Sequence, residues 1–301
     1  MTLTELKYIV AVARERHFGR AAEACFVSQP TLSVAIRKLE DELGVQIFER
    51  GSSEVSVTPI GVQIVEQAQR VLEQAGAIKE IAKHGKDPLS GPIRVGVIYT
   101  IGPYLLPQLV RQMIQDVPRM PMLLQENFTV KLLELLRQGE IDVAILADPF
   151  NAQGLATQPL YDEPFVVAVP ADHPMARRKS VPATLLKTET MLLLGTGHCF
   201  RDQVFEYCPA LSRKHHTRLG SVLEGSSLET LKHMVASGLG ITVLPESAVS
   251  NLDMNLVTTR PFRTPAPHRT VALAWRASFP RGQAIDLLLS TARQCRLDTK
   301  H

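Results

Sequence analysis

The chain has 301 residues, 45% of them hydrophobic, and a formal net charge of +3. This length is too great for one typical domain and suits two or three, each with its own core. No apolar run reaches the roughly 20 residues that cross a bilayer, and the first residues lack the basic and apolar regions of a signal peptide. We therefore expect a cytoplasmic protein with no membrane partner. Its four scattered cysteines exclude the disulfide framework of a small secreted protein.

A segment near the N-terminus is typical of a helix, a turn, a second helix and a wing. Small residues at 19–25 predict a short, closely packed helix, and residues 26–27 would form the turn. Ser28 is a good N-cap for the second helix, which should end at Gly44. This second helix should bury one apolar stripe, made of Leu32, Ile36, Leu39 and Leu43.

The other face of the second helix carries side chains that can bond base edges and phosphates, as the second helix of helix-turn-helix proteins does in the major groove. Short strands expected at 45–50 and 54–58 would add a wing hairpin. An ordinary solvated face is the alternative, and charge does not decide, because residues 1–90 hold 11 Lys or Arg and 12 Asp or Glu. The candidates for DNA contact are Ser28, Gln29, Pro30, Thr31, Ser33, Arg37, Lys38 and, in the wing, Arg50.

A long helix should follow from Pro59 to about Lys86, with Thr58 as its cap. Its apolar residues alternate spacings of four and three, the pattern of a two-stranded coiled coil. A dimer built on this seam would match a palindromic DNA site. A helix packed on its own domain is the alternative. The seam consists of Ile64, Ala68, Val71, Ala75, Ile78 and Ala82.

Beyond a turn-rich linker at 86–92, strand and helix patterns alternate, which predicts an α/β region with a parallel sheet. The elements fall into two sets, the second of which begins at Phe165. Strands are expected at 93–97, 122–125, 142–146, 165–169, 191–194, 240–244 and 270–275, and helices at 105–115, 130–138 and 227–237.

Cys199 and Cys208 lie close together in the sequence and could form a redox pair. His198 and Arg201 flank Cys199 with cations that would favour the thiolate, and a helix beginning at Cys199 would lower the pKa of this thiol further. Peroxide would convert such a thiolate to a sulfenic acid, which condenses with a second thiol to a disulfide. A helix from 199 to 208 would hold the two Cα atoms about 13 Å apart, whereas a disulfide needs roughly 4.4–6.8 Å. The segment would therefore have to refold on oxidation.

Plainer interpretations of the cysteines remain open. Cys25 fits a small core residue, and Cys295 has no evident partner. Cys199 and Cys208 could be a buried structural pair. We expect no metal, because a zinc site here would lack the Cys-x-x-Cys core that favours such sites; its ligands would be His198, Cys199, Cys208, His215 and His216.

Several short motifs occupy the first 86 residues: Phe18-Gly19-Arg20-Ala21-Ala22, Ser28-Gln29-Pro30-Thr31-Leu32-Ser33, Leu39-Glu40, Leu43-Gly44 and Phe48-Glu49-Arg50. Together they resemble the N-terminal half of LysR-type transcriptional regulators. One departure is the wing tip at 51–54, which lacks the Lys or Arg common in that family.

This resemblance implies a winged helix-turn-helix followed by a long linker helix and a two-lobed α/β regulatory domain similar to periplasmic binding proteins. The last strand of the chain would return to the first lobe. The implied boundaries are a DNA-binding domain at 1–58, a dimerisation helix at 59–87 and a redox-sensing domain at 92–301, with lobe I at about 92–162 and 266–301 and lobe II at about 163–265.

The motifs Thr100-Ile101-Gly102-Pro103-Tyr104, Gly197-His198-Cys199 and Arg201-Asp202-Gln203, with Cys208, narrow the resemblance to the OxyR group of peroxide sensors. A departure is the run 194–196, where an acidic residue is common. The resemblance implies that Cys199 is the peroxidatic thiol and Cys208 the resolving thiol, without a cofactor. The residues implied to hold or activate peroxide are Thr100, Thr129, His198, Arg201, Asp202 and Arg269.

We therefore expect a peroxide-responsive regulator of oxidative-stress genes, an activator or a repressor, and no enzyme. Its implied partners are promoter DNA, further copies of the chain as a dimer and tetramer, RNA polymerase, hydrogen peroxide as the signal and a thiol reductant such as glutaredoxin or glutathione. A LysR-type regulator that answers a small-molecule effector in the cleft between the lobes is the alternative. A thiol peroxidase is a third possibility, in which the winged domain would have no role.

Overall fold

The computed structural model describes residues 1–50, 55–84, 87–209, 222–249, 253 and 255–298. The chain divides into two units, one of residues 1–86 with 137–139 and one of residues 87–136 with 140–301. Among the residues described, no helix is both long enough and apolar enough to span a membrane.

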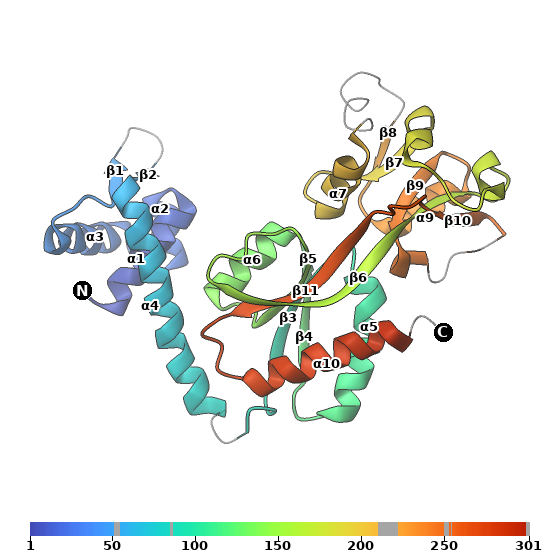
Figure 1. The fold of residues 1–301 in the computed structure, drawn as a ribbon. Coiled ribbons are helices and arrows are strands. Elements are labelled where there is room, and N and C mark those ends of the chain that lie inside the picture. Colours follow the sequence, from blue (N-terminus) through green and yellow to red (C-terminus); the bar gives the residue numbers. More distant parts are fainter. Residues whose placement is uncertain (51–54, 85–86, 210–221, 250–252, 254, 299–301) are drawn as a thin grey trace. The chain divides into compact units, whose positions relative to one another are not determined.

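The first unit is helical with one small hairpin (Figure 1). The expected helices, turn and caps are confirmed: the Ser28 hydroxyl accepts a hydrogen bond from the Thr31 backbone N–H at 3.3 Å, and Gly44 ends the second helix with a left-handed φ of 68°. The elements are α1 (Leu3–Glu15), α2 (Phe18–Ala24), α3 (Gln29–Leu43), β1 (Phe48–Arg50), β2 (Val55–Val57) and α4 (Pro59–His84).

Two corrections concern the apolar faces of this unit. Leu43 is 39% exposed and lies outside the buried stripe of α3, because the helix ends there. Ala68 is only 3% exposed, and Ile64 and Val71 pack with it on the core of the unit itself, since α1 lies against the start of α4. The first half of the expected dimer seam is therefore occupied within the unit, whereas Ile78, further along α4, is 69% exposed.

In place of Leu43, the end of α3 buries a carboxylate. Glu40 is 2% exposed, and its Oε1 accepts hydrogen bonds from the backbone N–H groups of Ile47 at 2.8 Å and Phe48 at 3.1 Å. Ile47 directly precedes β1 and Phe48 is its first residue, so Glu40 ties α3 to the hairpin.

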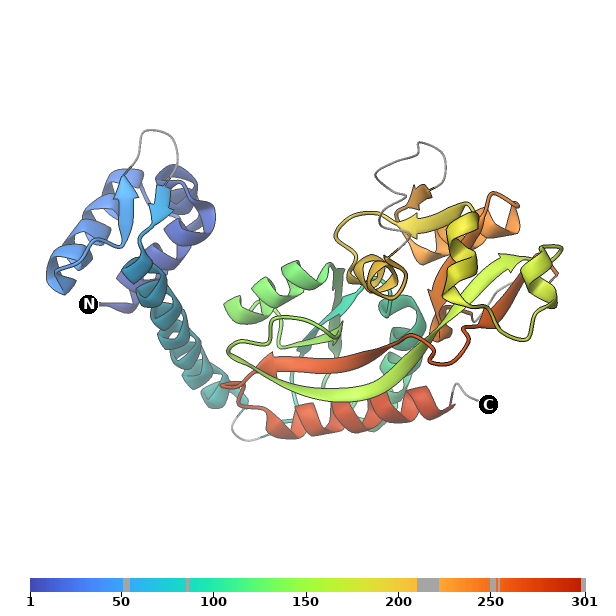
Figure 2. The ribbon, with the colours of Figure 1, turned by 45° about the horizontal axis from the view of Figure 1, so that its top comes forward.

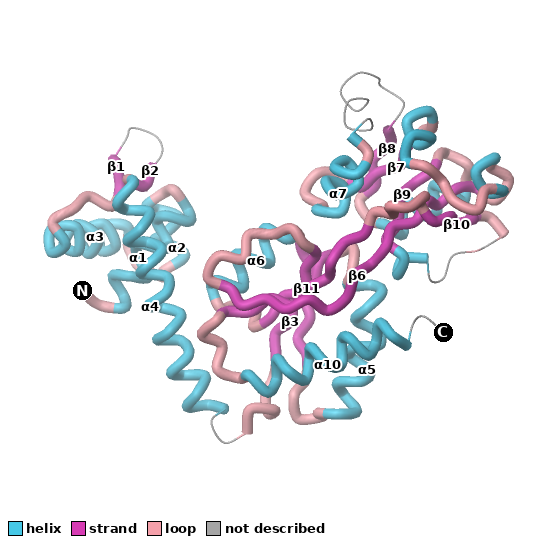
Figure 3. Tube along the Cα trace, viewed as in Figure 1, coloured by secondary structure: helices cyan, strands magenta, loops and turns pink. Residues whose placement is uncertain are grey.

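The second unit is an α/β structure with two cores. Figure 3 shows how its helices flank the strands. The first set of elements is β3 (Ile93–Ile98), α5 (Gly102–Asp116), β4 (Met122–Asn127), α6 (Thr129–Gln138), β5 (Val143–Ala147) and β6 (Leu155–Pro170). Then come the 3-10 turns η1 (Pro174–Arg177) and η2 (Ala183–Thr188), β7 (Met191–Leu194), α7 (Cys199–Tyr207), β8 (Val222–Gly225), α9 (Leu228–Ala236), β9 (Ile241–Pro245), η3 (Glu246–Val249), β10 (Val257–Pro261), β11 (His268–Arg276) and α10 (Gly282–Asp298).

The sheet is mixed, and the expectation of a parallel sheet was wrong. Its order is β4-β3-β5-β11-β6-β9-β7-β8, and β10 pairs with β6. Within each lobe β3 is parallel to β4 and β5, and β7 is parallel to β8 and β9, but β11 runs antiparallel to both β5 and β6. The long strands β6 and β11 lie side by side and cross between the lobes (Figures 1 and 2). This pairing confirms that the last strand returns to the first lobe.

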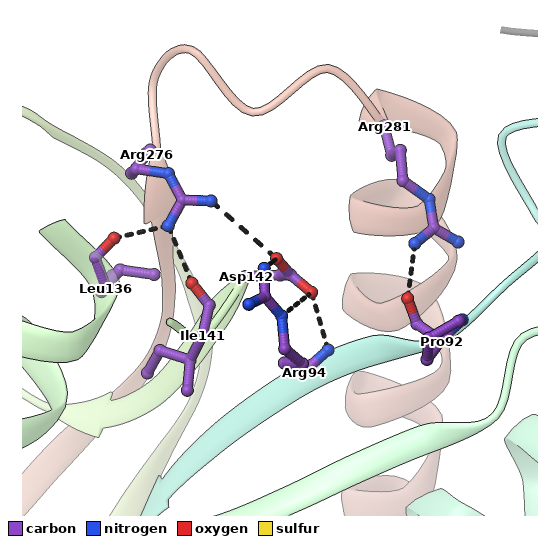
Figure 4. A network of polar contacts seen from close by, with 7 residues as sticks. All are labelled: Pro92, Arg94, Leu136, Ile141, Asp142, Arg276 and Arg281. Atoms are coloured by element: carbon purple, nitrogen blue, oxygen red, sulfur yellow. Dashed lines mark hydrogen bonds and ion pairs between the residues drawn. The ribbon is translucent and has the colours of Figure 1, made fainter. Parts of the chain in front are cut away.

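Polar contacts beneath the first lobe hold its strands together (Figure 4). Asp142, which precedes β5, accepts hydrogen bonds from the backbone and side chain of Arg94 on β3, the shortest at 2.7 Å. Arg276, at the end of β11, donates to the carbonyls of Leu136 and Ile141. The Cys295 side chain is buried in the core of the same lobe, where α10 packs with α5.

Replacement of Glu40 by alanine should destabilise the first unit by about 2 kcal/mol or more, because two buried N–H groups would lose their acceptor. Hydrogen exchange at Ile47 and Phe48 should accelerate, and the urea midpoint should fall. The matched control is Asp41→Ala, at the exposed neighbouring position, which should change stability by less than about 0.5 kcal/mol. Equal effects of the two variants would contradict the role given to Glu40.

Candidate redox site and DNA-contact face

Cys199 is the first residue of α7, and Cys208 is the residue at which that helix ends. Gly197, two residues before the helix, has a left-handed φ of +96°, and a side chain there would press on the ring of Phe128 at 3.3 Å. The chain therefore needs glycine to bring Cys199 close to the first lobe. Both thiols are free, and neither Cys25 nor Cys295 is in a disulfide.

The Cys199 side chain lines a small pocket where the first lobe meets α7. The pocket holds about 170 Å³ of space, part of it open to solvent. Two hydroxyl residues face it, Thr100 after β3 and Thr129 at the start of α6, and the Thr129 Oγ1 is buried without a hydrogen-bond partner among the described residues. The full lining is Ile98, Tyr99, Thr100, Asn127, Phe128, Thr129, Gly197, His198 and Cys199.

His198 lines one side of this pocket. It packs edge-on against Phe128 at 4.9 Å and Tyr99 at 6.0 Å between centroids. Burial lowers the pKa of His198 more than its hydrogen bond with the backbone of Ser226 raises it. This lowered pKa disfavours the cationic His198 that the sequence suggested beside Cys199.

Arg269 reaches the pocket only through Thr100. Its guanidinium donates to the Thr100 Oγ1 at 2.8 Å and to the Thr100 carbonyl at 2.9 Å, and it pairs with Glu163 at 2.7 Å. It also lies over the ring of Phe200, 5.3 Å from the centroid. Of these residues, only Thr100 can contact a molecule in the pocket.

Arg201 and Asp202 lie outside the pocket lining, contrary to expectation. Arg201 pairs with Glu224 at 2.9 Å and donates to the Leu194 carbonyl, and Asp202 is exposed. Helical geometry accounts for Arg201, which is turned about 200° from Cys199 around the axis. Asp202 lies about 4.5 Å further along the helix than Cys199, away from the residues that line the pocket.

Cys199 and Cys208 have different surroundings. Cys199 is half-buried at the pocket, at the positive end of the α7 dipole. Cys208 is 5% exposed in the core of the second lobe, and burial raises the pKa of its thiol to about 11. With α7 formed, nine residue steps separate them by about 13 Å along the axis.

Several contacts that the sequence did not indicate hold α7 in place. The Gln203 side chain donates to the Asp148 carbonyl at 2.7 Å, and the Tyr207 hydroxyl donates to the Pro265 carbonyl at 2.7 Å. The local sequence does not reveal these two partners, because each lies more than 50 residues away in the chain. The amide of Gln203, in the Arg201-Asp202-Gln203 motif, shows only that a side chain able to form hydrogen bonds is present.

On α3, most DNA-contact candidates are accessible. Gln29, Pro30 and Thr31 are exposed in the first turn, and Ser28 is exposed but shares its hydroxyl with Thr31 at 2.7 Å. Ser33 is half-buried, and Arg37 and Lys38 are exposed. The Arg50 side chain and the wing tip at 51–54 lie outside the described residues, as do His215 and His216 of the alternative zinc site.

Family models match both units: "Bacterial regulatory helix-turn-helix protein, lysR family" over residues 3–62, and "LysR substrate binding domain" over residues 86–295. The "Hydrogen peroxide-inducible genes activator" of Pectobacterium carotovorum subsp. carotovorum is 42% identical over 98% of this chain and 96% of its own. The "DNA-binding transcriptional dual regulator OxyR" of Escherichia coli (strain K12) is 42% identical over 97% of this chain and 95% of its own.

Solved structures agree with the sequence relatives. A full-length OxyR variant from Pseudomonas aeruginosa has 55% identity and a TM-score of 0.72, over 98% of this chain and 95% of that one. A hydrogen-peroxide-bound OxyR variant from Corynebacterium glutamicum has 34% identity and a TM-score of 0.65, over 99% of this chain and 93% of that one. The chain belongs to the LysR family of bacterial regulators, within the OxyR group.

Proposed function

We propose that this chain is a DNA-binding transcription regulator in which hydrogen peroxide oxidises Cys199. The oxidised Cys199 then forms a reversible disulfide with Cys208. One observation carries the proposal: a free thiol lies in a small pocket with two threonine hydroxyls, at one end of a helix whose other end is a second free thiol. The names of the relatives reported above, a hydrogen peroxide-inducible genes activator and OxyR proteins, support the same signal.

The proposed chemistry has two steps. The Cys199 thiolate attacks one peroxide oxygen, the O–O bond breaks, and the second oxygen leaves as hydroxide, so sulfur is oxidised by two electrons to the sulfenic acid. The Cys208 sulfur, on losing its proton, then attacks the Cys199 sulfur. An S–S bond forms, the S–O bond breaks, and water leaves. A dithiol reductant such as glutaredoxin, or glutathione, would return both thiols.

The pocket size favours peroxide over a larger effector. Sites for drug-sized ligands enclose about 300–1,000 Å³, whereas the enclosed part of the pocket at Cys199 measures about 10 Å³, close to the room that one water molecule needs. The space and the hydroxyls suit a very small polar molecule. A regulator that binds an organic effector in the interlobe cleft remains the second candidate.

Disulfide formation would require α7 to unwind, because its length exceeds the Cα separation of a disulfide by about twofold. Unwinding would break the Gln203–Asp148 and Tyr207–Pro265 hydrogen bonds. We propose that the resulting shift between the lobes is passed through the oligomer to the DNA-binding domains.

The remaining assignments are part of the proposal. Residues 1–58 would bind promoter DNA, the helix at 59–87 would dimerise through its exposed part near Ile78, and residues 92–301 would sense peroxide. The assembly would be a tetramer that acts on RNA polymerase, and the chain would have no enzymatic role.

One equivalent of hydrogen peroxide should convert the reduced protein to a form with a 199–208 disulfide, found by peptide mass spectrometry and reversed by dithiothreitol. Cys199→Ser should abolish the reaction, and Cys208→Ser should stop it at a sulfenic acid that dimedone traps. Cys25→Ser is the control and should react normally. Unreacted thiols at 199 and 208 in the parent protein would contradict the proposal and favour the organic effector.

In the reduced protein, iodoacetamide at pH 7.5 should label Cys199 at least tenfold faster than Cys208, as peptide mapping would show. With a pKa of about 11, only roughly one Cys208 thiol in a thousand or fewer is ionised at that pH. The Cys208 rate should rise about tenfold per pH unit between 7 and 9, because its pKa lies above this range. Buried Cys295 serves as the slow comparator, and equal labelling of 199 and 208 would contradict the distinct environments.

Gln29→Ala should weaken specific promoter binding by roughly fivefold to a hundredfold, the loss of one base contact of about 1–3 kcal/mol, with binding to unrelated DNA unchanged. Fluorescence anisotropy at fixed salt would measure both affinities. Gln46→Ala, an exposed glutamine beyond the end of α3, is the matched control and should bind as the parent does. Unchanged specific binding by Gln29→Ala would remove this residue from the contact face.

A further inference from the structure

A fully buried ion pair lies where the two long strands pair. Glu163 on β6 stands directly opposite Arg269 on β11, and the exposed fraction of both side chains is 0%. Burial acts to raise the pKa of Glu163, but the charge of Arg269 and the hydrogen bonds from Ser247 and Arg269 outweigh it and hold this pKa below its usual value. The pair is therefore charged at neutral pH.

Glu163 and Thr100 hold the Arg269 guanidinium from two sides. Its Nε donates to the Glu163 Oε2 at 2.7 Å, while Nη1 and Nη2 donate to the Thr100 hydroxyl and carbonyl at 2.8 and 2.9 Å. The other carboxylate oxygen of Glu163 accepts from the Ser247 backbone N–H at 3.1 Å. Because a guanidinium is a rigid planar fork, fixing one edge on Glu163 fixes the direction of the other edge toward Thr100.

This arrangement sets the role of the Thr100 hydroxyl. An oxygen that accepts a hydrogen bond from a guanidinium keeps its own proton for another acceptor. Thr100 lines the pocket with Cys199, so its proton is available to a molecule there. When the thiolate attacks peroxide, one oxygen leaves as hydroxide, and a donor placed in advance at that oxygen stabilises the developing charge.

We infer that Glu163 is a positioning residue for the reaction of Cys199 with peroxide: it orients Arg269, and Arg269 makes the Thr100 hydroxyl a donor toward the pocket. The inference rests on the proposed peroxide-sensing function. Stability alone does not explain the pair, since buried ion pairs are often no more stabilising than apolar residues of the same volume.

The test compares Glu163→Gln with Asp162→Asn. Asp162 is the exposed neighbour, which accepts from the Thr270 hydroxyl at 2.7 Å and can still do so as asparagine. In each full-length variant, two second-order rate constants at Cys199 are measured by quenching and peptide mass spectrometry, one with hydrogen peroxide and one with iodoacetamide. Iodoacetamide reports thiolate reactivity without a peroxide oxygen to stabilise.

For Glu163→Gln the peroxide rate constant should fall by roughly tenfold, less than the 10²–10³ that follows loss of a direct oxyanion donor. Its iodoacetamide rate should stay within about twofold of the parent, and both rates of Asp162→Asn should be unchanged. A parallel fall of both rates in Glu163→Gln would show a general structural effect and overturn the inference, as would an unchanged peroxide rate.

A double-mutant cycle with Thr100→Val then tests the route of action. If Glu163 acts through the Thr100 hydroxyl, adding Glu163→Gln to Thr100→Val should change the peroxide rate by less than about twofold. Full additivity would overturn the inference. If Glu163→Gln does not fold, Glu163→Asp replaces it, because aspartate keeps the charge but has a shorter side chain. The same result is expected for this variant: a lower peroxide rate constant with an unchanged iodoacetamide rate constant. A parent protein that does not react with peroxide at Cys199 would instead refute the proposed function itself.

Discussion

The length of α7 is the constraint on which the proposed switch depends. The helix α7 runs from Cys199 to Tyr207, and Cys208 follows as its C-cap. A rise of about 1.5 Å per residue places the Cα atoms of Cys199 and Cys208 about 13 Å apart, roughly twice the separation in a disulfide. While α7 is intact, the disulfide proposed above could not form. If the two thiols were already within bonding distance, the bond could form without moving the chain. Here the proposed bond and the intact helix exclude each other, so formation of the bond would require a change of structure.

Two kinds of contact hold α7, burial of apolar side chains along its whole length and single hydrogen bonds near its end. At the start, Gly197 brings Cys199 against the first lobe, and Phe200 and Val204 enter the core of the second. Toward the end, the hydrogen bonds of Gln203 and Tyr207 to distant carbonyls are single and partly exposed. Hydrogen bonds of this kind contribute about 1 kcal/mol each, whereas a buried phenylalanine contributes about 1.5–3 kcal/mol. Most of the cost of unwinding α7 therefore comes from extracting its apolar side chains.

Local patterns predicted what depends on neighbours in the sequence. The Ser28 cap, the Gly44 stop, the start of α7 and most strand positions were foreseeable because capping and periodicity act within a few residues. What failed depended on distant packing. Burial beside the rings of Tyr99 and Phe128 lowers the pKa of His198, and the antiparallel return of β11 makes the sheet mixed. The strand β10 and the helix α10 were not predicted from the sequence. The pairing of Glu163 with Arg269 could not be predicted, because the two residues lie 106 positions apart in the chain.

Arg269 connects the reactive pocket to the helix that must unwind. Its guanidinium orders Thr100 on the pocket side, and the same cation lies over the ring of Phe200, the residue after Cys199. Phe200 packs in turn on Phe165, two residues beyond Glu163 on β6. If the first turn of α7 unwinds, the ring of Phe200 no longer covers the Arg269 guanidinium, which stays bound to Glu163. Water can then reach the guanidinium charge, and the Thr100 hydroxyl is held less firmly in its direction toward the pocket. The arrangement that makes Cys199 reactive would thus persist only while α7 is intact, and formation of the disulfide would dismantle the site that began it.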